Sequence, residues 1–561
     1  MANLIEQAKK QGEELLKRSL ALACDKGLVP DGAELKGSVS ISKGFGDFAA
    51  NHAMATAGIV RMNPRELAEI LTENIDFEGS MFSKAEVAGK GFINFTLSQL
   101  WYGQVLRCIS DEGRDYGSVA DGGGEKVMIE FVSANPTGPM TIGNARGGVL
   151  GDALASVMKK AGYDVWREFY VNDEGNQVEL FAQSIEARYI QLIKGRDAIE
   201  FPDNGYHGDD IKDLARALYE RDGDKYLSMP VQERRAAIAK FALPHNIELM
   251  KQHLERYRIH YDCWFLESSL HRDGYVEDTV NLLTREGYTY EKDGALWLKN
   301  TALGADKDEA LRRANGFYTY YAVDIAYHRD KFVRRNFSRV IDVWGADHHG
   351  HAIRFKATMS APGLGLEGRK LDFLIMQMVR LVRGDETVKV SKRTGKALTL
   401  NDLLDEIGVD ACRFFFNAKP DSHLEFDLDL AIRQDSENPV YYVQYAHARI
   451  CSLIETLAGE GFTVSEAADM SQLKAVQEQQ LIKQLAAFPE EISLAARDYD
   501  PSKINRYVID VAAAFHRFYN ACRIKGEAAP LLMARLKLAD CTRIVIAEAL
   551  SIIGVSAPEK M

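Results

Sequence analysis

The stretch Val127–Gly162, VMIEFVSANPTGPMTIGNARGGVLGDALASVMKKAG, decides the fold of this chain. It opens with an apolar run, VMIEFV, that is too short for a buried helix and therefore predicts a strand. The following segment is rich in Gly, Pro, Asn and Thr, which is typical of a loop. From Arg146 onward the apolar residues recur at helical spacing, and Gly162 ends the helix.

A second strand candidate, Val165–Val171 (VWREFYV), follows this helix directly. Strand, loop, helix and strand in this order form a βαβ unit, which implies parallel strands and a right-handed crossover. The pattern resumes at Val340–Trp344 (VIDVW), which precedes the loop GADHHGH, a helix and the apolar run FLIMQMVRLV. We therefore predict a doubly wound, Rossmann-like parallel sheet.

The rest of the chain divides around this parallel-sheet domain, which we place at residues 119–419. Residues 176–300 predict a mostly helical insertion, with one hairpin at YEKDGALWLK turning at Asp293-Gly294. Residues 1–118 mix helical and strand patterns and predict a small α+β domain. Residues 420–561 are expected to be a succession of helices forming a bundle.

The composition limits the classes of protein to which the chain can belong. Its 561 residues are too many for one hydrophobic core, and no apolar run approaches the roughly 20 residues of a membrane span. The seven cysteines contain no CxxC pair, which argues against structural zinc and disulfides and for the cytoplasm. Net charge is −12, and the one basic cluster, Arg329–Arg339, predicts a solvated helix face.

The loop between the first strand and helix is where a nucleotide should bind. It lies outside the carboxyl ends of parallel strands, and the helix that follows offers free N–H groups and a positive dipole end to phosphate. Gly143 would let a ribose or purine approach the backbone closely. The segment matches neither the GxGxxG dinucleotide fingerprint nor the GxxxxGK[ST] phosphate loop.

SANPTGPMTIGNARGG resembles the first signature of class I aminoacyl-tRNA synthetases, in the form that arginyl-tRNA synthetases carry. That form reads His-x-Gly-His after Pro-Thr-Gly-Pro. Here Gly143 and its context match, whereas Thr141 and Asn144 occupy the two histidine positions. The resemblance extends along the whole chain through segments that occur in the family's order: GDFAANHA, GKGFINFTLS, FYVNDEGNQVE, YDCWFLESSLH, YYAVDIAYHRDKF, VWGADHHGHAIR, NPVYYVQYAHARI and GVSAPEKM.

A second signature follows at Thr387–Arg393 (TVKVSKR), which is similar to the Lys-Met-Ser-Lys-Ser loop of the same class. The resemblance implies that Lys389, Ser391 and Lys392 stabilise the charge that develops on the phosphates of ATP during activation. Some family members lack the second lysine of this loop and carry a lysine four residues before the first motif. This chain has Thr137 there and retains Lys392.

The resemblance also implies the substrate sites. A guanidinium needs acceptors and at least one carboxylate, and Asp324 would pair with it beside Tyr320. Glu130 and Asn135 would hold the amino and carboxylate end of arginine. The ATP site would comprise the following residues: Pro139, Thr141, Gly143, Asn144, His348 and Lys392.

Two further segments are implied to contact tRNA. Phe92 and Asn94 correspond to family positions that touch the tRNA elbow, with Phe92 in the core of the small domain as the alternative. The C-terminal bundle resembles an anticodon-binding domain, and its expected contacts are Tyr442, His447, Tyr519 and Asn520. Interior packing is the alternative for Tyr442.

The resemblance as a whole implies an enzyme that forms arginyl-adenylate from arginine and ATP with Mg²⁺ and then charges tRNA-Arg, as a cytoplasmic monomer without a protein-bound metal. Two alternatives are open. One is a catalytically weakened or inactive paralogue that binds tRNA or amino acid as a regulator, which the replaced histidines motivate. The other is a class I synthetase for another amino acid such as cysteine, which the lack of paired Cys and His ligands and the presence of Asp324 oppose.

Overall fold

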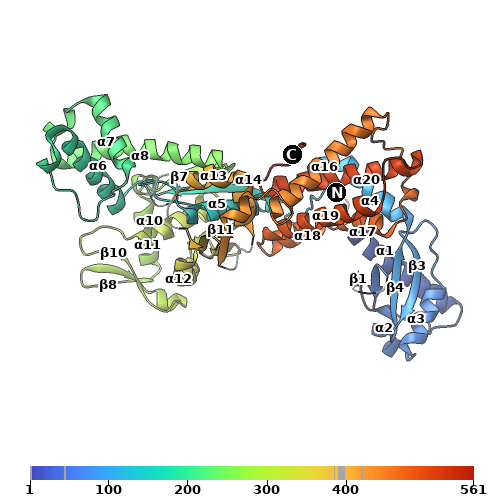
Figure 1. The fold of residues 1–561 in the computed structure, drawn as a ribbon. Coiled ribbons are helices and arrows are strands. Elements are labelled where there is room, and N and C mark those ends of the chain that lie inside the picture. Colours follow the sequence, from blue (N-terminus) through green and yellow to red (C-terminus); the bar gives the residue numbers. More distant parts are fainter. Residues whose placement is uncertain (1–2, 43, 45, 385, 389–397, 419–422) are drawn as a thin grey trace.

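The computed structural model describes residues 3–42, 44, 46–384, 386–388, 398–418 and 423–561. The molecule is elongated (Figure 1). The N-terminal domain lies beside the C-terminal helices at one end, the parallel sheet lies in the middle, and the insertion helices project at the other end. None of the helices in the described ranges combines the length and apolar character that crossing a bilayer requires.

The N-terminal domain packs three helices against an antiparallel sheet with strand order β1-β2-β4-β3. Helix α3 begins with Asn63 as its cap and Pro64 in its first turn, and it buries Leu67, Ala68 and Leu71 at helical spacing. The elements are α1 (Leu4–Asp25), β1 (Val39–Ile41), β2 (Phe48–Ala50), α2 (His52–Val60), α3 (Pro64–Glu73), β3 (Phe82–Ala88), β4 (Phe92–Leu97) and α4 (Gln99–Glu112).

The central sheet is parallel throughout and has the order β12-β11-β5-β6-β7, which confirms the predicted doubly wound fold. Its order reverses between β5 and β11, and such a switch point leaves a crevice at the carboxyl ends of the two strands. Its elements are β5 (Lys126–Glu130), α5 (Ile142–Lys160), β6 (Asp164–Val171), β7 (Cys263–Leu266), α11 (Tyr320–Arg329), β11 (Arg339–Gly345), α12 (His349–Met359) and β12 (Lys370–Met376).

Two strand predictions were wrong. The range 176–300 was expected to be an insertion apart from its hairpin, yet β7 within it forms the edge of the central sheet by pairing with β6. The range from 420 onward was expected to be helical, yet β15 (Leu424–Asp427) pairs with β13 (Val379–Arg383). Both strands have only four residues and are created by pairing with distant segments, so local periodicity does not reveal them.

The insertion has a hydrophobic core of its own, built from helices α6, α7 and α8. The predicted hairpin is present: Lys292 pairs with Ala295, and Asp293 and Gly294 adopt φ angles of 53° and 75°, as a two-residue turn of this kind requires. The remaining elements of the region are α6 (Asn176–Lys194), α7 (Asp209–Asp222), α8 (Val231–Arg256), α9 (Ser268–Arg272), α10 (Tyr275–Arg285), β8 (Thr289–Lys292), β9 (Ala295–Leu298) and β10 (Glu309–Arg312).

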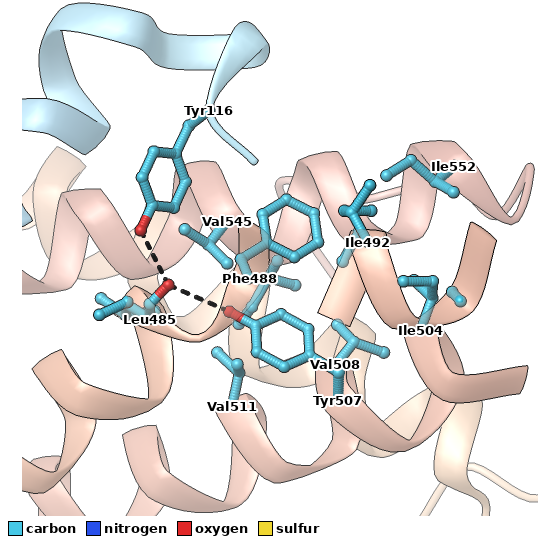
Figure 2. Close-up of a cluster of buried hydrophobic side chains, with 14 of the residues drawn as sticks. Tyr116, Leu485, Phe488, Ile492, Ile504, Tyr507, Val508, Val511, Val545 and Ile552 are labelled. Atoms are coloured by element: carbon cyan, nitrogen blue, oxygen red, sulfur yellow. Dashed lines mark hydrogen bonds between the residues drawn. The ribbon is translucent and has the colours of Figure 1, made fainter. Parts of the chain in front are cut away.

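The C-terminal region is a helical bundle that also holds the linker from the N-terminal domain. The hydroxyl groups of Tyr116 and Tyr507 both donate to the main-chain oxygen of Leu485, at 3.0 and 3.3 Å, inside an apolar cluster around Phe488 (Figure 2). The elements that precede the bundle are β14 (Glu386–Thr387), which pairs with β13, α13 (Leu400–Ile407) and α14 (Val409–Asn417). The helices from residue 420 onward are α15 (Leu428–Ile432), α16 (Pro439–Gly459), α17 (Val476–Ala486), α18 (Phe488–Arg497), α19 (Ser502–Ala521) and α20 (Ala529–Ile552).

Candidate active site

The loop before α5 ends in a reciprocal cap formed by the two residues that replace the signature histidines. The Thr141 amide and hydroxyl both donate to Oδ1 of Asn144, at 2.9 Å each, and the Asn144 amide donates back to Oγ1 of Thr141 at 3.4 Å. Such a capping box satisfies N–H groups that the helix itself leaves free. Because the cap uses Oδ1 of Asn144, its Nδ2 group is left as a donor for another partner.

Removal of this cap should loosen the start of α5. In Thr141→Ala the hydroxyl that accepts from Asn144 is lost, and losing an N-cap of this type costs about 1 kcal/mol. We expect the amides of Gly143–Ala145 to exchange with deuterium roughly five times faster, because about 1 kcal/mol corresponds to a factor of that size. Hydrogen exchange with mass spectrometry would measure this, and unchanged exchange would show that the cap does not stabilise the loop.

The segments on both sides of the second signature lie close to the loop before α5. Thr141 forms a bridge with Thr399, and the Leu400 amide donates to the Met140 oxygen at 3.0 Å. Lys389, Ser391 and Lys392 lie outside the described residues. A cavity of about 720 Å³ separates the α5 loop from these flanks, and that volume is within the range of small-molecule sites. Its lining includes Thr141, Gly143, Met378, Thr387, Val388 and Leu398.

Helix α11 places the predicted guanidinium-binding residues one turn apart. Tyr320 is 46% exposed, and the Asp324 side chain is 34% exposed, so both are open to a ligand. Nε2 of His351 lies 3.6 Å from Oδ2 of Asp324. Gly175 has φ of +87°, and a Cβ there would lie 3.2 Å from the Tyr320 hydroxyl, so glycine leaves that phenol room.

Glu130 ends β5 below this helix and is buried, with 8% of its surface exposed. Its Oε2 accepts from Nζ of Lys331 at 2.6 Å, and its Oε1 accepts from the Ser133 hydroxyl at 2.8 Å. Burial raises the pKa of the Glu130 carboxyl, and Lys331 opposes that shift. Both carboxylate oxygens are therefore already engaged by protein groups.

The other residues predicted to bind substrates lie in the loops at the crevice. Asn135 and Pro139 are exposed in the loop between β5 and α5. The His348 side chain is 55% exposed after β11, and its ring lies 5.8 Å from that of Trp344. The loops thus converge on the switch point of the sheet.

His351 was not singled out from the sequence. Its ring stacks on Trp344 at 5.3 Å while its Nε2 faces Asp324. The motif GADHHGH contains it, but only helix α12 brings this third histidine toward α11.

The basic cluster is not the solvated helix face that we predicted. Lys331 is completely buried, Arg335 pairs with Glu168 and Asp330, and Arg339 pairs with Glu125. Lys331 and Arg334 lie in a π-helical turn, Asp330–Arg334, that follows α11.

The predicted tRNA contacts occupy different environments. Phe92 is 43% exposed on β4, so it does not belong to the core of the small domain, and Asn94 follows two residues later on the same strand. Tyr442 is half-buried against His516. The guanidinium of Arg449 lies 5.1 Å from the ring centroid of Tyr519, and Asn520 is exposed.

His447 is positioned differently from our expectation. It is only 3% exposed, and its Nδ1 is 2.9 Å from the main-chain oxygen of Pro558. The ring thereby fixes the C-terminal segment to α16. The C-terminal segment thus covers this side chain in the structure, and its contact with tRNA stays a prediction.

A doubly wound parallel sheet whose switch point faces a capped helix start is the architecture of a class I aminoacyl-tRNA synthetase. Three family models match the chain: "Arginyl tRNA synthetase N terminal domain" over residues 11–97, "tRNA synthetases class I (R), catalytic domain" over 106–427 and "DALR anticodon binding domain" over 443–561. The chain belongs to the arginyl-tRNA synthetase family.

Relatives of similar length support this assignment. The arginine–tRNA ligases of Acetivibrio thermocellus and Caldanaerobacter subterraneus are 52% and 50% identical, and each alignment covers 100% of both chains. A crystal structure of a putative arginyl-tRNA synthetase from Campylobacter jejuni has a TM-score of 0.76 and 33% identity, covering 83% of this chain and 100% of that one. The Thermus thermophilus arginyl-tRNA synthetase shares the fold, with a TM-score of 0.71 at 21% identity over 97% of this chain and 99% of that chain.

Proposed function

We propose that this chain is an arginine–tRNA ligase that forms arginyl-adenylate from L-arginine and ATP and then transfers arginine to tRNA-Arg. The observation that carries the proposal is that two features occur together at the carboxyl end of the central sheet. One is the solvent-accessible carboxylate of Asp324, and the other is the capped start of helix α5 at Thr141. The carboxylate suits a guanidinium, and the helix start suits phosphate. Full-length similarity to arginine–tRNA ligases supports the same reaction.

We assign each substrate to a part of the crevice. Tyr320 and Asp324 would bind the guanidinium, and Asn135 would bind the amino and carboxylate end, supported by Glu130. ATP, which brings Mg²⁺ as part of the substrate, would occupy the cavity beside the α5 loop. The groups proposed to contact ATP are Pro139, Thr141, Gly143, Asn144, His348 and, in the second signature, Lys389, Ser391 and Lys392.

Catalysis in this scheme is positioning and charge stabilisation. The arginine carboxylate attacks the α-phosphate, the bond to pyrophosphate breaks, and cationic and N–H donors stabilise the added negative charge on the phosphoryl oxygens. The proposed tRNA contacts are Phe92, Asn94, Tyr442, His447, Tyr519 and Asn520. We further propose that the protein acts in the cytoplasm as a monomer.

The deciding experiment is aminoacylation of total tRNA with radiolabelled arginine, ATP and Mg²⁺. We expect charging that depends on all three substrates and on active enzyme. If folded protein binds tRNA but charges nothing above background, the inactive regulator becomes the correct reading. Charging with cysteine in place of arginine would instead assign the chain to another member of the class.

Restoring the signature histidines tests whether Thr141 and Asn144 are defects. Because these residues cap each other, replacing either one breaks two of the three hydrogen bonds at the start of α5. We therefore expect kcat for arginine activation to stay level or fall in Thr141→His and in Asn144→His, measured by tRNA-dependent pyrophosphate exchange. A severalfold rise in kcat would mean that the missing imidazoles limit the reaction.

A further inference from the structure

Lys331 is a fully buried cation directly behind the proposed arginine site. It lies in the π-helical turn Asp330–Arg334, which follows α11 without a break. Turns of this type are rare and are frequent at functional sites, because they redirect a side chain that an α-helix would point elsewhere. Here the turn directs Nζ of Lys331 to within 2.6 Å of Glu130 Oε2 and 3.0 Å of Asp342 Oδ1.

The ammonium group occupies a position that resembles a metal site. Glu130, His328 and Asp342 each offer one ligand atom, and these atoms lie within 4.8 Å of one another. Nζ of Lys331 is bonded to both carboxylates and lies 3.4 Å from Nε2 of His328. A covalently attached cation therefore fills the centre of this set of ligands.

Lys331 stays charged in this position. Burial alone would lower the pKa of its ammonium group, but Asp342 and Glu130 overcome that effect and raise it. Burial likewise opposes ionisation of Asp342, whereas Lys331 and His328 lower the pKa of its carboxyl. The buried cluster thus keeps its charges paired, as a cluster cut off from water must.

The buried charged cluster, which consists of Glu130, His328, Lys331 and Asp342, joins the two ends of the proposed arginine site. From Glu130 the path runs through Lys331 to Oδ1 of Asp342, whose Oδ2 lies 2.7 Å from Nε2 of His328. The other ring nitrogen of His328 lies 2.9 Å from the main-chain oxygen of Asp324. A chain of hydrogen bonds therefore links the end of β5, beneath the amino end of the substrate, to the first turns of α11, which hold the guanidinium ligand.

We propose that Lys331, Asp342 and His328 are positioning residues that set the distance between Glu130 and Asp324, and thereby the length of the cationic amino acid that the site accepts. This inference rests on the proposed function. Charged pairs with several fixed hydrogen bonds resist displacement more than apolar contacts of the same size. All three side chains are buried, so the set acts through the spacing of the two binding residues.

The test compares Lys331→Met with a matched variant, Lys537→Met, which removes another buried lysine, 2% exposed and paired with Glu466 in the C-terminal bundle. In pyrophosphate exchange with saturating tRNA we expect Lys331→Met to raise KM for arginine at least tenfold. We expect KM for ATP to change less than twofold, and Lys537→Met to leave both constants within twofold.

Length selectivity is the second readout. One methylene in a binding pocket changes kcat/KM by roughly 10- to 200-fold. We expect the preference for arginine over homoarginine to fall about tenfold in Lys331→Met. If KM for arginine and ATP rise together while this preference stays constant, the cluster is only structural and the proposal is wrong.

His328→Gln tests the proposal if Lys331→Met does not fold. A glutamine amide can reach Asp342 in the place of Nε2, but it loses the contact to the Asp324 oxygen. We expect the same rise in KM for arginine with ATP binding retained, and an unchanged KM for arginine would overturn the proposal. Failure of the wild-type protein to charge arginine would instead overturn the proposed function, so the two outcomes are distinguishable.

Discussion

Asp324→Ala should lower kcat/KM for arginine by about 100- to 1,000-fold while leaving ATP binding within threefold of wild type. Removing the carboxylate partner of a guanidinium in a partly desolvated site costs roughly 3–4 kcal/mol. Asp324 is open enough to meet a ligand, and its main-chain oxygen, which the substitution preserves, is the group bound by His328. The scaffold around the site should therefore survive the change.

The measurements are pyrophosphate exchange with varied arginine and fluorescence titration with an ATP analogue. Asp213→Ala is a matched control, because it removes an exposed aspartate on α7 in the insertion and should leave both constants unchanged. Equal losses of arginine and ATP affinity in Asp324→Ala would remove our assignment of the guanidinium site. A loss seen only as reduced kcat would place the carboxylate elsewhere in the reaction.

Arg413→Ala should destabilise the junction between the catalytic sheet and the helical bundle by roughly 3–5 kcal/mol, the usual cost of leaving a buried charge without its partner. The Arg413 guanidinium is fully buried and donates to Asp152 on α5, to the Tyr257 oxygen and to the Ile553 oxygen. Gly554 packs against it so closely that any Cβ there would clash. One side chain thus joins α14, α5, the end of the insertion and the C-terminal segment.

Urea unfolding followed by tryptophan fluorescence would measure the shift. The double variant Arg413→Met/Asp152→Asn should recover part of the loss, because it removes the buried carboxylate charge while an amide oxygen remains for Arg167, which lies 3.3 Å from Asp152. Arg497→Ala removes an exposed pair with Asp498 and should leave the urea midpoint close to that of the wild type, because water and salt screen such a pair. If Arg413→Ala unfolds no earlier than Arg497→Ala, the buried junction does not stabilise the molecule.

Much of the fold could be predicted because its central units are local. The strand, loop and helix of Val127–Gly162 are adjacent in sequence, and their periodicities are long enough to distinguish strand from helix. The cap residues of α5 and the turn at Asp293-Gly294 have strong local preferences for the same reason. The short strands β7 and β15 were not predicted, because each exists only by pairing with a strand far away in sequence.

The candidate site likewise contains residues that the sequence could locate and residues whose roles only the structure revealed. Thr141, Gly143 and Asn144 could be located because they lie in one loop between two recognisable elements, and full-length resemblance added Tyr320 and Asp324. The roles of Lys331 and His447 could not be predicted. A lysine in a basic run is usually solvated, and nothing local shows that a π-helical turn aims this one at two carboxylates.

The sequence by itself thus determined the family, the doubly wound sheet and the position of the loop that begins α5, because these depend on local order along the chain. Only the tertiary structure decided how Thr141 and Asn144 cap each other, how Glu130 is held from behind, and how His447 binds the C-terminal segment. The contact between Glu130 and Lys331, for example, joins residues 201 positions apart in the sequence. Such contacts have no local signature, because their energy exists only after the chain has folded.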